Sequence, residues 1–351
     1  MSIVRVDYTH VGRRTTGIER ITTEQFSSAA LSPLPIRPFG AGASRLHVMA
    51  AQTVGLPACA IRNRSDIFVF PGFPPCPYFA FAPDRAVLYV HDLFLLTRRA
   101  DLNPAAKYYL APMFSIAVKK LRYFLTNSRE TARQLREHCD PAATIIPYRP
   151  RIRNVFDLTI GDRTERASRP DRLRIVSIGT VEPRKNLIAA ADICGALAAR
   201  LRRPVEHHII GRFGWGEDAE LLRKRANVIL HGALNDAQIR PLVAAADILL
   251  CTSHQEGLGL PLLEAQYSGI PVVAPDAAVF REVVGSSGLF IDPKSPACAA
   301  EQIAGAISDA CWRRRYATAS TANVAGWNTV AENDRAAVVA FLSRLCRNHK
   351  G

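Results

Sequence analysis

Two glutamates, Glu256 and Glu264, form the sharpest chemical signal in the sequence. They lie in the stretch HQEGLGLPLLE (254–264), directly after an apolar run that is typical of a buried strand. Pro261 suits the first residue of a helix, because its missing N–H would have no partner there anyway. The pattern therefore predicts a glycine-rich loop entering a helix, with one carboxylate in the loop and the other in the first turn.

Such a loop could hold a phosphorylated sugar or a nucleotide. The amides of Leu258, Gly259 and Leu260 would point outward from a helix N-terminus, where the helix dipole favours phosphate. Carboxylates accept hydrogen bonds from hydroxyl groups, which a sugar and a ribose supply. The alternative is that Glu264 only complements the helix dipole and that Glu256 is solvated.

Two cations mark a second candidate site, in the stretch GTVEPRKN (179–186). Arg184 and Lys185 precede a long helical pattern, for which Asn186 is a reasonable N-cap. Cations at the start of a helix oppose its dipole, so their presence suggests a bound anion. Otherwise, both side chains simply extend into water. A glycine-rich turn at 211–216 ends a third predicted strand and is a weaker signal.

These motifs are positioned by short apolar strands that alternate with helices, a pattern that predicts two parallel, doubly wound sheets. Ligands of such sheets bind outside the carboxyl ends of the strands. In the second half we expect strands at 174–179, 207–211, 228–232, 247–253, 271–275 and 289–292, and a helix from Asn186 to Arg203. In the first half we expect strands at 3–9, 66–72, 86–92, 123–128 and 144–148, helices at 17–30, 104–122 and 128–138, and loops at 38–44 and 71–77.

The boundaries follow from composition. We expect an N-terminal domain at 1–150, a polar linker at 151–172, a second domain at 173–325 and a C-terminal segment at 326–351. That segment holds an amphipathic helix from Thr329 to Arg347, which could pack back toward the first domain. Two doubly wound domains would face a central cleft suited to a reaction between two substrates.

Charge and composition limit the function classes. Residues 1–170 carry 24 Lys and Arg against 13 Asp and Glu, which leaves most of the net charge of +14 in the first half. This charge could attract nucleic acid, an anionic bilayer or a phosphorylated substrate, or it could be an ordinary arginine-rich surface. The eight cysteines are scattered, and no apolar run is long enough for a membrane span or a secretory signal. We therefore expect a cytoplasmic protein, with contact to the inner face of the cytoplasmic membrane as a possibility.

Several longer stretches carry a family resemblance. GTVEPRKN, HHIIGRFGW, VILHGALNDAQI, ADILLCTSHQEGLGLPLLEAQYSGIPVVA and FREVVGSSGLFIDP together resemble the donor domain of family 4 retaining glycosyltransferases, which have the α/β, two-domain GT-B fold. The Glu-x₇-Glu spacing is the most specific of these motifs. TTGIERI (15–21), VHDLFLL (90–96) and TNSRETARQL (126–135) resemble landmarks of the acceptor domain. The variant TVEPRKN is similar to bacterial mannosyltransferases.

The resemblance implies roles for individual residues. Lys185 and Arg184 would hold the donor diphosphate, Glu264 the ribose hydroxyls, and Glu256 the transferred sugar. The remaining implied contacts with the donor are His91 near the sugar, Gly17 near the phosphates, the loop residues Gly257, Leu258, Gly259 and Leu260, the strand-end residues Thr180 and Gly211, and the base-packing residues His231, Gly232 and Leu234. The family often has arginine where this chain has Thr180, so Arg184 could supply the missing charge.

The implied reaction is a retaining, metal-independent transfer of a hexose from a nucleoside diphosphate sugar, with GDP-mannose the leading donor. Lys185 and Arg184 would stabilise the departing diphosphate while the acceptor enters on the same face. No Asp-x-Asp occurs in the chain, which favours catalysis without a divalent metal, and no other cofactor is expected. The expected acceptor is a glycan or a lipid-linked saccharide in the synthesis of a cell-surface polysaccharide or lipopolysaccharide.

Three competing functions share some of these features. A nucleotide-sugar epimerase would have the same architecture, and a dinucleotide-dependent dehydrogenase would also have doubly wound domains. However, this chain lacks the G-x-G-x-x-G motif that such a dehydrogenase would have after its first strand. A non-catalytic nucleic-acid-binding protein is suggested by charge alone, because the sequence contains no recognisable binding module. We therefore expect no nucleic-acid partner.

Overall fold

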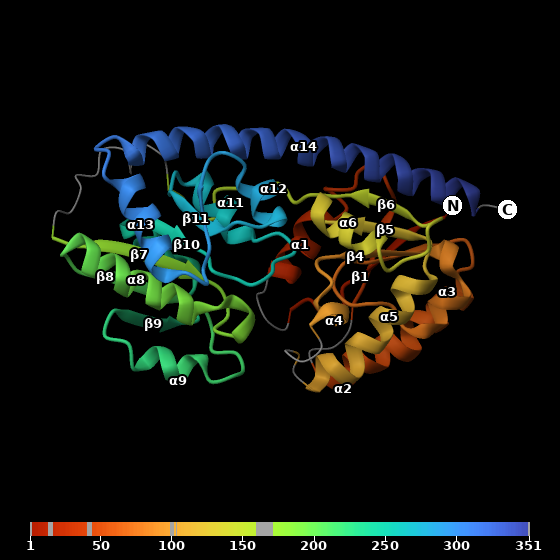
Figure 1. The fold of residues 1–351 in the computed structure, drawn as a ribbon. Helices are drawn as coiled ribbons and strands as arrows, with labels where there is room; N and C mark the ends of the chain where they lie inside the picture. Colours follow the sequence, from red (N-terminus) through yellow and green to blue (C-terminus); the bar gives the residue numbers. More distant parts are fainter. Residues whose placement is uncertain are drawn as a thin grey trace. The chain divides into compact units, whose positions relative to one another are not determined.

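The computed structural model describes residues 2–12, 17–40, 44–98, 102, 104–158 and 171–349. The chain divides into two compact units, one of Met1–Arg151 with Thr329–Gly351 and one of Ile152–Asn328. Each unit contains a six-stranded sheet in which all neighbouring strands are parallel, with helices on its faces (Figure 1). The alternation of strand and helix explains this arrangement, since parallel strands need long crossovers. The predicted α/β class is confirmed.

The first sheet has the order β2-β1-β3-β4-β5-β6. Its strands are β1 (Val4–Asp7), β2 (Ile36–Phe39), β3 (Ile67–Phe70), β4 (Ala86–Val90), β5 (Tyr123–Thr126) and β6 (Thr144–Pro147). Every residue of β3 and β4 is buried, as expected for central strands covered on both faces. The order reverses between β1 and β3, so a crevice for ligands is expected where their carboxyl ends meet.

The helices of the first unit are α1 (Gly17–Gln25), α2 (Arg45–Ala50), η1 (Ala51–Gly55), α3 (Leu56–Arg62), η2 (Pro77–Phe81), η3 (Pro83–Arg85), α4 (Phe94–Thr97), η5 (Ala106–Leu110), α5 (Ala111–Lys120) and α6 (Arg129–Arg136). The predicted N-cap of α6 is confirmed, because the Ser128 hydroxyl accepts a hydrogen bond from the Thr131 amide at 3.0 Å. A core cluster of Leu56, Phe70, Phe114 and Phe124 shows that α3, α5 and the sheet pack together.

Strand β2 and the helical segment α2–η1–α3 were not predicted from the sequence. Strand β2 falls partly inside the predicted loop at 38–44, since Pro38 and the glycines around it indicated a turn. Pro38 is tolerated because β2 is an edge strand, whose outward side needs no ladder hydrogen bond. The segment α2–η1–α3 was assigned no structure, although Ser44 caps it by accepting from the His47 amide. Conversely, α1 ends at Gln25, earlier than the predicted helix.

The second sheet has the order β12-β11-β10-β7-β8-β9, which reverses between β7 and β10. Its strands are β7 (Leu173–Ile178), β8 (Val205–Ile210), β9 (Val228–Gly232), β10 (Ile248–Leu250), β11 (Val272–Pro275) and β12 (Leu289–Ile291). Its helices are η6 (Pro183–Lys185), α8 (Leu187–Leu201), α9 (Asp218–Arg223), α10 (Asp236–Ala245), α11 (Leu260–Tyr267), α12 (Ala278–Val284), α13 (Pro296–Ile307) and the start of α14 (Trp312–Asn348). Two core clusters, one on each side of the sheet, hold these layers together.

Three boundaries differ from expectation. Asn186 does precede α8, but it has a left-handed backbone (φ 52°) and makes no side-chain cap. Helix α11 begins at Leu260, so Pro261 is its second residue. Helix α14 begins at Trp312 instead of Thr329, because buried side chains such as Val324 and Trp327 continue its apolar face toward the N-terminus. Of the predicted linker, residues 159–170 lie outside the described part of the chain.

The core of the second unit contains a buried histidine on β8. The Ser177 hydroxyl donates to the Leu250 carbonyl at 2.7 Å, so it accepts from His207 Nε2 at 2.9 Å, which leaves His207 Nδ1 unprotonated and without a partner. Burial, with a smaller contribution from His208, lowers the pKa of His207 to about 3. The side chain is therefore neutral in the folded protein at every pH where an unfolded histidine takes up a proton.

This difference in protonation predicts a pH dependence of stability. Below about pH 6.5 the unfolded chain binds a proton at His207 that the folded chain does not, so the unfolding free energy falls as the pH falls. His207→Leu should remove about 2 kcal/mol of the loss between pH 7 and pH 5. Urea unfolding at the two pH values measures it, with the exposed His138→Gln as the control. An unchanged pH dependence in His207→Leu would contradict the assignment.

Candidate active site

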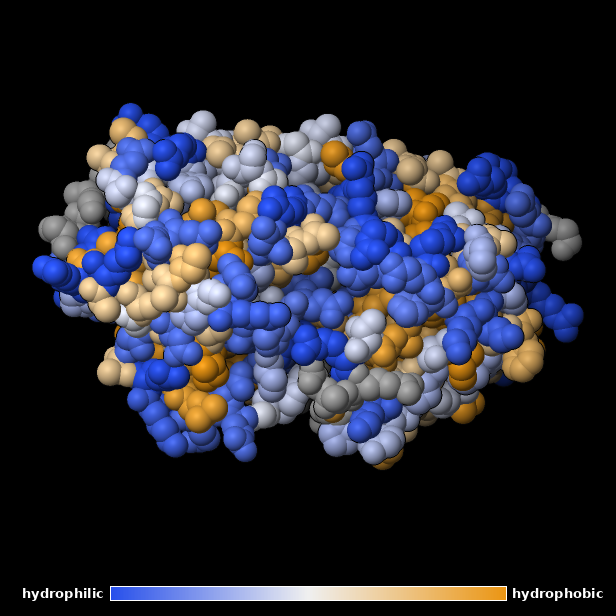
Figure 2. Space-filling model, viewed as in Figure 1, coloured by the Kyte–Doolittle hydropathy of each residue, from blue (hydrophilic) through white to orange (hydrophobic). Residues whose placement is uncertain are grey.

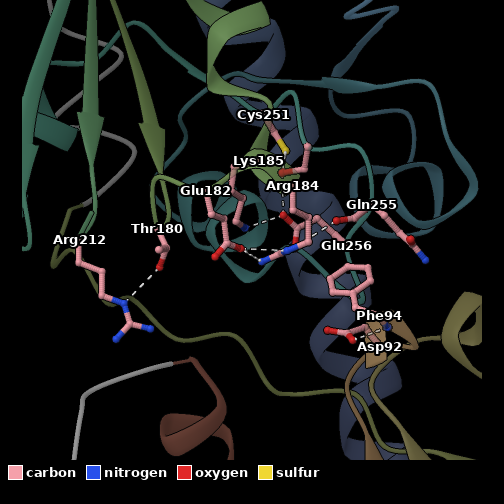
Figure 3. Close-up of polar contacts among 11 residues, drawn as sticks. Asp92, Phe94, Thr180, Glu182, Arg184, Lys185, Arg212, Cys251, Gln255 and Glu256 are labelled. Atoms are coloured by element: carbon pink, nitrogen blue, oxygen red, sulfur yellow. Dashed lines mark hydrogen bonds and ion pairs between the residues drawn. The ribbon is translucent and has the colours of Figure 1, made fainter. Parts of the chain in front are cut away.

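A buried ion cluster lies at the carboxyl end of the second sheet, centred on Glu256. Lys185 Nζ is 2.6 Å from one carboxylate oxygen and Arg184 is 3.1 Å from the other. The Ser253 hydroxyl donates to the same carboxylate at 2.7 Å, and Arg184 also binds Glu182 at 2.7 Å (Figure 3). The structure therefore brings together the two predicted cations and the first glutamate of the Glu-x₇-Glu pair.

The charge state of Glu256 follows from these contacts. Burial alone would raise the pKa of its carboxyl, but Lys185 and Arg184 outweigh burial and lower that pKa to about 2. Glu256 is thus ionised at any ordinary pH, and neither of the open alternatives, a solvated glutamate or two cations extended into water, describes the site. A carboxylate with so low a pKa is also a weak base and a weak nucleophile.

The cluster lies where the strand order of the sheet reverses. It borders a small cavity of about 30 Å³, lined by the ends of β7 and β10, by Lys185 and Glu256, and by Gly259 and Pro261 at the start of α11. A cavity of that volume holds about one water molecule. Since the cations already contact Glu256, a diphosphate would have to take over their hydrogen bonds to bind there.

Backbone turns at the strand ends hold the two cations in place. After β7 the chain turns through Gly179 and the short helix η6, and the Thr252 hydroxyl donates to the carbonyls of Lys185 (3.2 Å) and Asn186 (2.9 Å). Gly211 directly follows β8 and packs against the turn after β7. A Cβ at Gly211 would lie 1.9 Å from the Gly179 carbonyl oxygen. Only glycine fits at Gly211, which makes its predicted contact with a ligand also a packing requirement.

The loop before α11 has the predicted character in part. Gly259 adopts φ 81° as the residue before the helix, a conformation that favours glycine. The side chain of Leu258 is buried in the core, so only its backbone is available to a ligand. Glu264 is buried in α11 and does not line the small cavity. Gly257 lies in the loop before this helix, and Leu260 is the first residue of the helix.

The remaining predicted donor contacts lie at neighbouring strand ends. The Thr180 hydroxyl accepts from Arg212 Nε at 3.4 Å (Figure 3). His231, the penultimate residue of β9, lies 2.9 Å from His208 with stacked rings, and burial followed by His208 lowers the pKa of His231. Gly232 has φ 70°, and Leu234 packs on the core. None of these four predicted residues lines the cavity beside Glu256.

In the first unit, histidines follow β1 and β4, the two strands that flank β3. His91, directly after β4, donates from Nε2 to the Pro71 carbonyl at 2.6 Å, and burial lowers its pKa to about 4. His10, after β1, lies 2.9 Å from the Thr22 hydroxyl, and burial followed by His91 lowers its pKa to about 4. A Cβ at Gly72 would lie 2.3 Å from the His10 ring. Both imidazoles are therefore neutral at pH 7 and keep Nδ1 as a hydrogen-bond acceptor.

Gly17 is exposed and is the first residue of α1, where the expected helix at 17–30 was predicted to begin. Residues 13–16, which include the start of the TTGIERI motif, lie outside the described residues. The contact of Gly17 with phosphate stays a prediction.

Sequence reasoning missed several residues of the ion cluster and of the first unit. Glu182, Ser253 and Thr252 were inside quoted motifs, yet nothing in their spacing showed that they would contact Arg184, Glu256 and the η6 backbone. Asp7, whose pKa burial raises to about 6, and His10 were assigned no role in a site. Their significance arises from burial, which a single sequence does not reveal.

The part of the chain that the structure describes offers neither a metal-binding cluster nor a membrane-spanning helix. Within the described residues, no three His, Cys, Asp or Glu side chains lie close enough together to hold a metal ion. Among the helices of the same residues, none combines the length and apolar character that crossing a membrane requires.

The ion cluster falls inside a segment that a family model matches. Residues 161–322 match the family model of glycosyl transferases group 1. The chain is 34% identical over 141 residues to the O-antigen chain mannosyltransferase B of Escherichia coli, covering 39% of this chain and 37% of that protein. It is 30% identical over 249 residues to the D-inositol 3-phosphate glycosyltransferase of Geodermatophilus obscurus, covering 63% and 53%. The chain thus spans about half or less of these curated relatives.

Among solved structures, sucrose-phosphate synthase from Thermosynechococcus elongatus superposes with a TM-score of 0.73 at 12% identity, covering 99% of each chain. At that identity the likeness shows a shared fold, which is that of GT-B glycosyltransferases. These findings do not support the epimerase alternative. The segment that matches the family model contains Lys185, Glu256 and Glu264. This segment, a little under half of the chain, resembles the glycosyl transferases group 1 family.

Proposed function

We propose that the chain transfers a hexose from a nucleoside diphosphate sugar to a hydroxyl of a saccharide acceptor, with retention of configuration. The observation that carries this proposal is the ion cluster of Arg184, Lys185 and Glu256, which lies at the strand-order reversal of the sheet inside the matched segment. Two cations beside an ionised carboxylate can exchange that carboxylate for a diphosphate, while the carboxylate then accepts hydrogen bonds from sugar hydroxyls.

The low pKa of Glu256 supports a same-face mechanism. A covalent intermediate would need a nucleophilic carboxylate, and two cations make Glu256 a poor one. In the same-face route, the bond from the sugar C1 to the phosphate oxygen breaks while the acceptor oxygen approaches the same face. The leaving phosphate takes the acceptor proton, and Arg184 and Lys185 stabilise the negative charge that develops.

The other predicted residues complete the donor site. We propose that Glu264 accepts hydrogen bonds from the ribose hydroxyls and that the backbone from Gly257 to Leu260 approaches the sugar. The turn His231–Leu234 would pack against the base, next to Gly211 and Thr180. Neutral His91 would accept a hydrogen bond from a sugar hydroxyl at Nδ1, a role that an imidazolium could not fill.

The donor sugar, the acceptor and the setting are finer proposals. GDP-mannose is the leading donor, supported by the similarity to an O-antigen mannosyltransferase. We propose a glycan or a lipid-linked saccharide as the acceptor, in cell-surface polysaccharide or lipopolysaccharide synthesis at the cytoplasmic face of the membrane. Arg184 and Lys185 would neutralise the diphosphate, so no divalent metal would be required.

A donor panel tests the proposal directly. Thermal-shift and calorimetric titrations with GDP-mannose, a UDP-hexose, dTDP-rhamnose and NAD, each with and without EDTA, should show binding of one sugar nucleotide that EDTA leaves unchanged. Tightest binding of GDP-mannose would support mannose transfer. Binding that EDTA abolishes would contradict metal independence, and binding of NAD alone would contradict the proposed activity.

The phosphate role of Lys185 makes a kinetic prediction. Lys185→Ala should lower kcat at least about 30-fold, which is about 2 kcal/mol of transition-state stabilisation, the scale of one lost oxyanion partner. The exposed Lys224→Ala serves as the control because it removes the same charge elsewhere in the second unit. Turnover within a factor of two of the wild type, in a variant with a normal melting temperature, would remove Lys185 from the mechanism.

The competition between Glu256 and phosphate makes a second prediction. Glu256→Gln should leave Arg184 and Lys185 without their charged partner and strengthen the binding of inorganic pyrophosphate at least tenfold, about 1.4 kcal/mol. Sugar transfer by the same variant should fall strongly. Calorimetric titration measures the affinity, with Glu301→Gln as an exposed control. Weaker pyrophosphate binding in Glu256→Gln would show that the two cations do not form the anion site.

A further inference from the structure

Exposed apolar side chains are frequent in one stretch of the first unit. Half of the large hydrophobic residues that are exposed in the described chain fall between residues 46 and 116. They are Leu46, Met49, Val54, Ile61, Phe81, Tyr108 and Ile116. Several protrude almost fully, with exposed fractions of 78% for Leu46 and 88% for Phe81. Scattered single residues of this kind are ordinary, so only those that share one face can indicate an interaction surface.

The helical segment α2–η1–α3 is apolar on both of its sides. Val48, Gln52, Leu56 and Ala60 are its buried residues, and their regular spacing of four defines the side that faces the core. The π-helical turn η1 maintains that spacing. Leu46, Met49, Val54 and Ile61 lie on the exposed side. A helix that is apolar all round is normally buried, so the exposed side of this one lacks its partner.

The helices that carry this surface have no acidic residue. Residues 45–62 include Arg45, His47 and Arg62, and residues 104–120 include Lys107, Lys119 and Lys120, without any Asp or Glu. The two segments are neighbours, because Tyr109 donates to Gln52 at 3.2 Å and Leu56 shares a core cluster with Phe114. In the space-filling view, apolar and hydrophilic groups alternate over α2, α3 and α5 at the lower right (Figure 2).

A pocket of about 580 Å³ adjoins the end of this surface. It is lined by Ile61, which also belongs to the exposed apolar side of α3, and by Arg5, Arg37, Arg62 and Arg64. Arg5 is paired with Asp66 at 2.6 Å, whereas Arg37, Arg62 and Arg64 form no ion pair with any residue that the structure describes. The pocket borders the residues that enter β1 and β3. It therefore lies at the amino ends of the parallel strands, whereas His91 lies at their carboxyl ends.

We propose that the exposed side of α2–η1–α3, together with this arginine-lined pocket, docks the protein on a bilayer that contains anionic phospholipids. The apolar side chains would enter the interface between headgroups and acyl chains, while the pocket would receive a headgroup phosphate. This combination of an apolar helix face with flanking cations is what an interfacial helix requires. The surface belongs to the first unit and the ion cluster to the second, so the proposal does not depend on which sugar is transferred.

Charge and shape favour a bilayer over the other occupants. A second copy of this chain would place the cations of two identical surfaces against each other, with no carboxylate on either helix to offset them. A free phosphate would use the pocket but would leave the apolar side chains in water. An anionic bilayer meets both features at once, because its phosphates lie directly above its apolar layer.

Vesicle flotation with the full chain tests the proposal. Wild-type protein should bind phosphatidylcholine vesicles containing 30% phosphatidylglycerol (about one lipid in three) at least tenfold more tightly than pure phosphatidylcholine vesicles. The double variant Leu46→Ser/Val54→Ser should lose at least tenfold in affinity for the anionic vesicles. Arg62→Gln/Arg64→Gln should remove the preference for anionic over neutral vesicles. All of these positions are exposed, and an unchanged melting temperature would verify the fold.

Matched variants in the second unit serve as controls. Leu221→Ser/Ile229→Ser removes two exposed apolar side chains, and Lys224→Gln/Lys294→Gln removes two exposed charges; both should bind as the wild type does. The proposal is overturned if the wild type does not bind anionic vesicles, or if the controls lose as much affinity as the test variants. It is equally overturned if Leu46→Ser/Val54→Ser abolishes self-association in light scattering and leaves vesicle binding unchanged.

Discussion

The second unit depends on one electrostatic constraint, the buried carboxylate of Glu256 between Lys185 and Arg184. An ionised carboxyl in the interior is tolerated only when cations and hydrogen-bond donors surround it, and here Ser253 adds a third contact. The same cations that hold Glu256 are those that a diphosphate would need. Ligand binding and the stability of this sheet edge are therefore coupled, because each anion competes for the same two side chains.

The backbone of the sheet fixes where that constraint can operate. Parallel strands bring all their carboxyl ends to one edge, and the reversal of order between β7 and β10 opens a space between diverging connections. Gly211 keeps the loops after β7 and β8 in contact, and Gly259 turns the chain into α11. In the first unit, His10 and His91 likewise lie at the carboxyl ends of parallel strands. Burial keeps both imidazoles neutral and leaves an acceptor nitrogen on each.

The segment α2–η1–α3 shows why periodicity failed at one place and succeeded elsewhere. Helix α8 has an apolar run with a cationic entry motif and was found with small errors at its ends. Strand β9 spans the residues that its sequence pattern predicts. The segment at 45–62 has apolar residues on both sides, which erases the contrast on which a helical period depends. The physical cause of the missed element is also the feature that makes its exposed surface unusual.

The α/β class and most strands of both sheets could be predicted from the residues alone, because local apolar patterns and turn chemistry specify them within short windows. The same holds for the motif residues Glu256, Glu264, Arg184 and Lys185. Tertiary structure alone decided that Glu256 binds both cations, that Glu264 is buried away from the small cavity, and that Thr252 and Ser253 support the site. These contacts join loops far apart in the sequence, and their strength comes from burial. No residue spacing encodes the degree of burial, so it had to come from the folded chain.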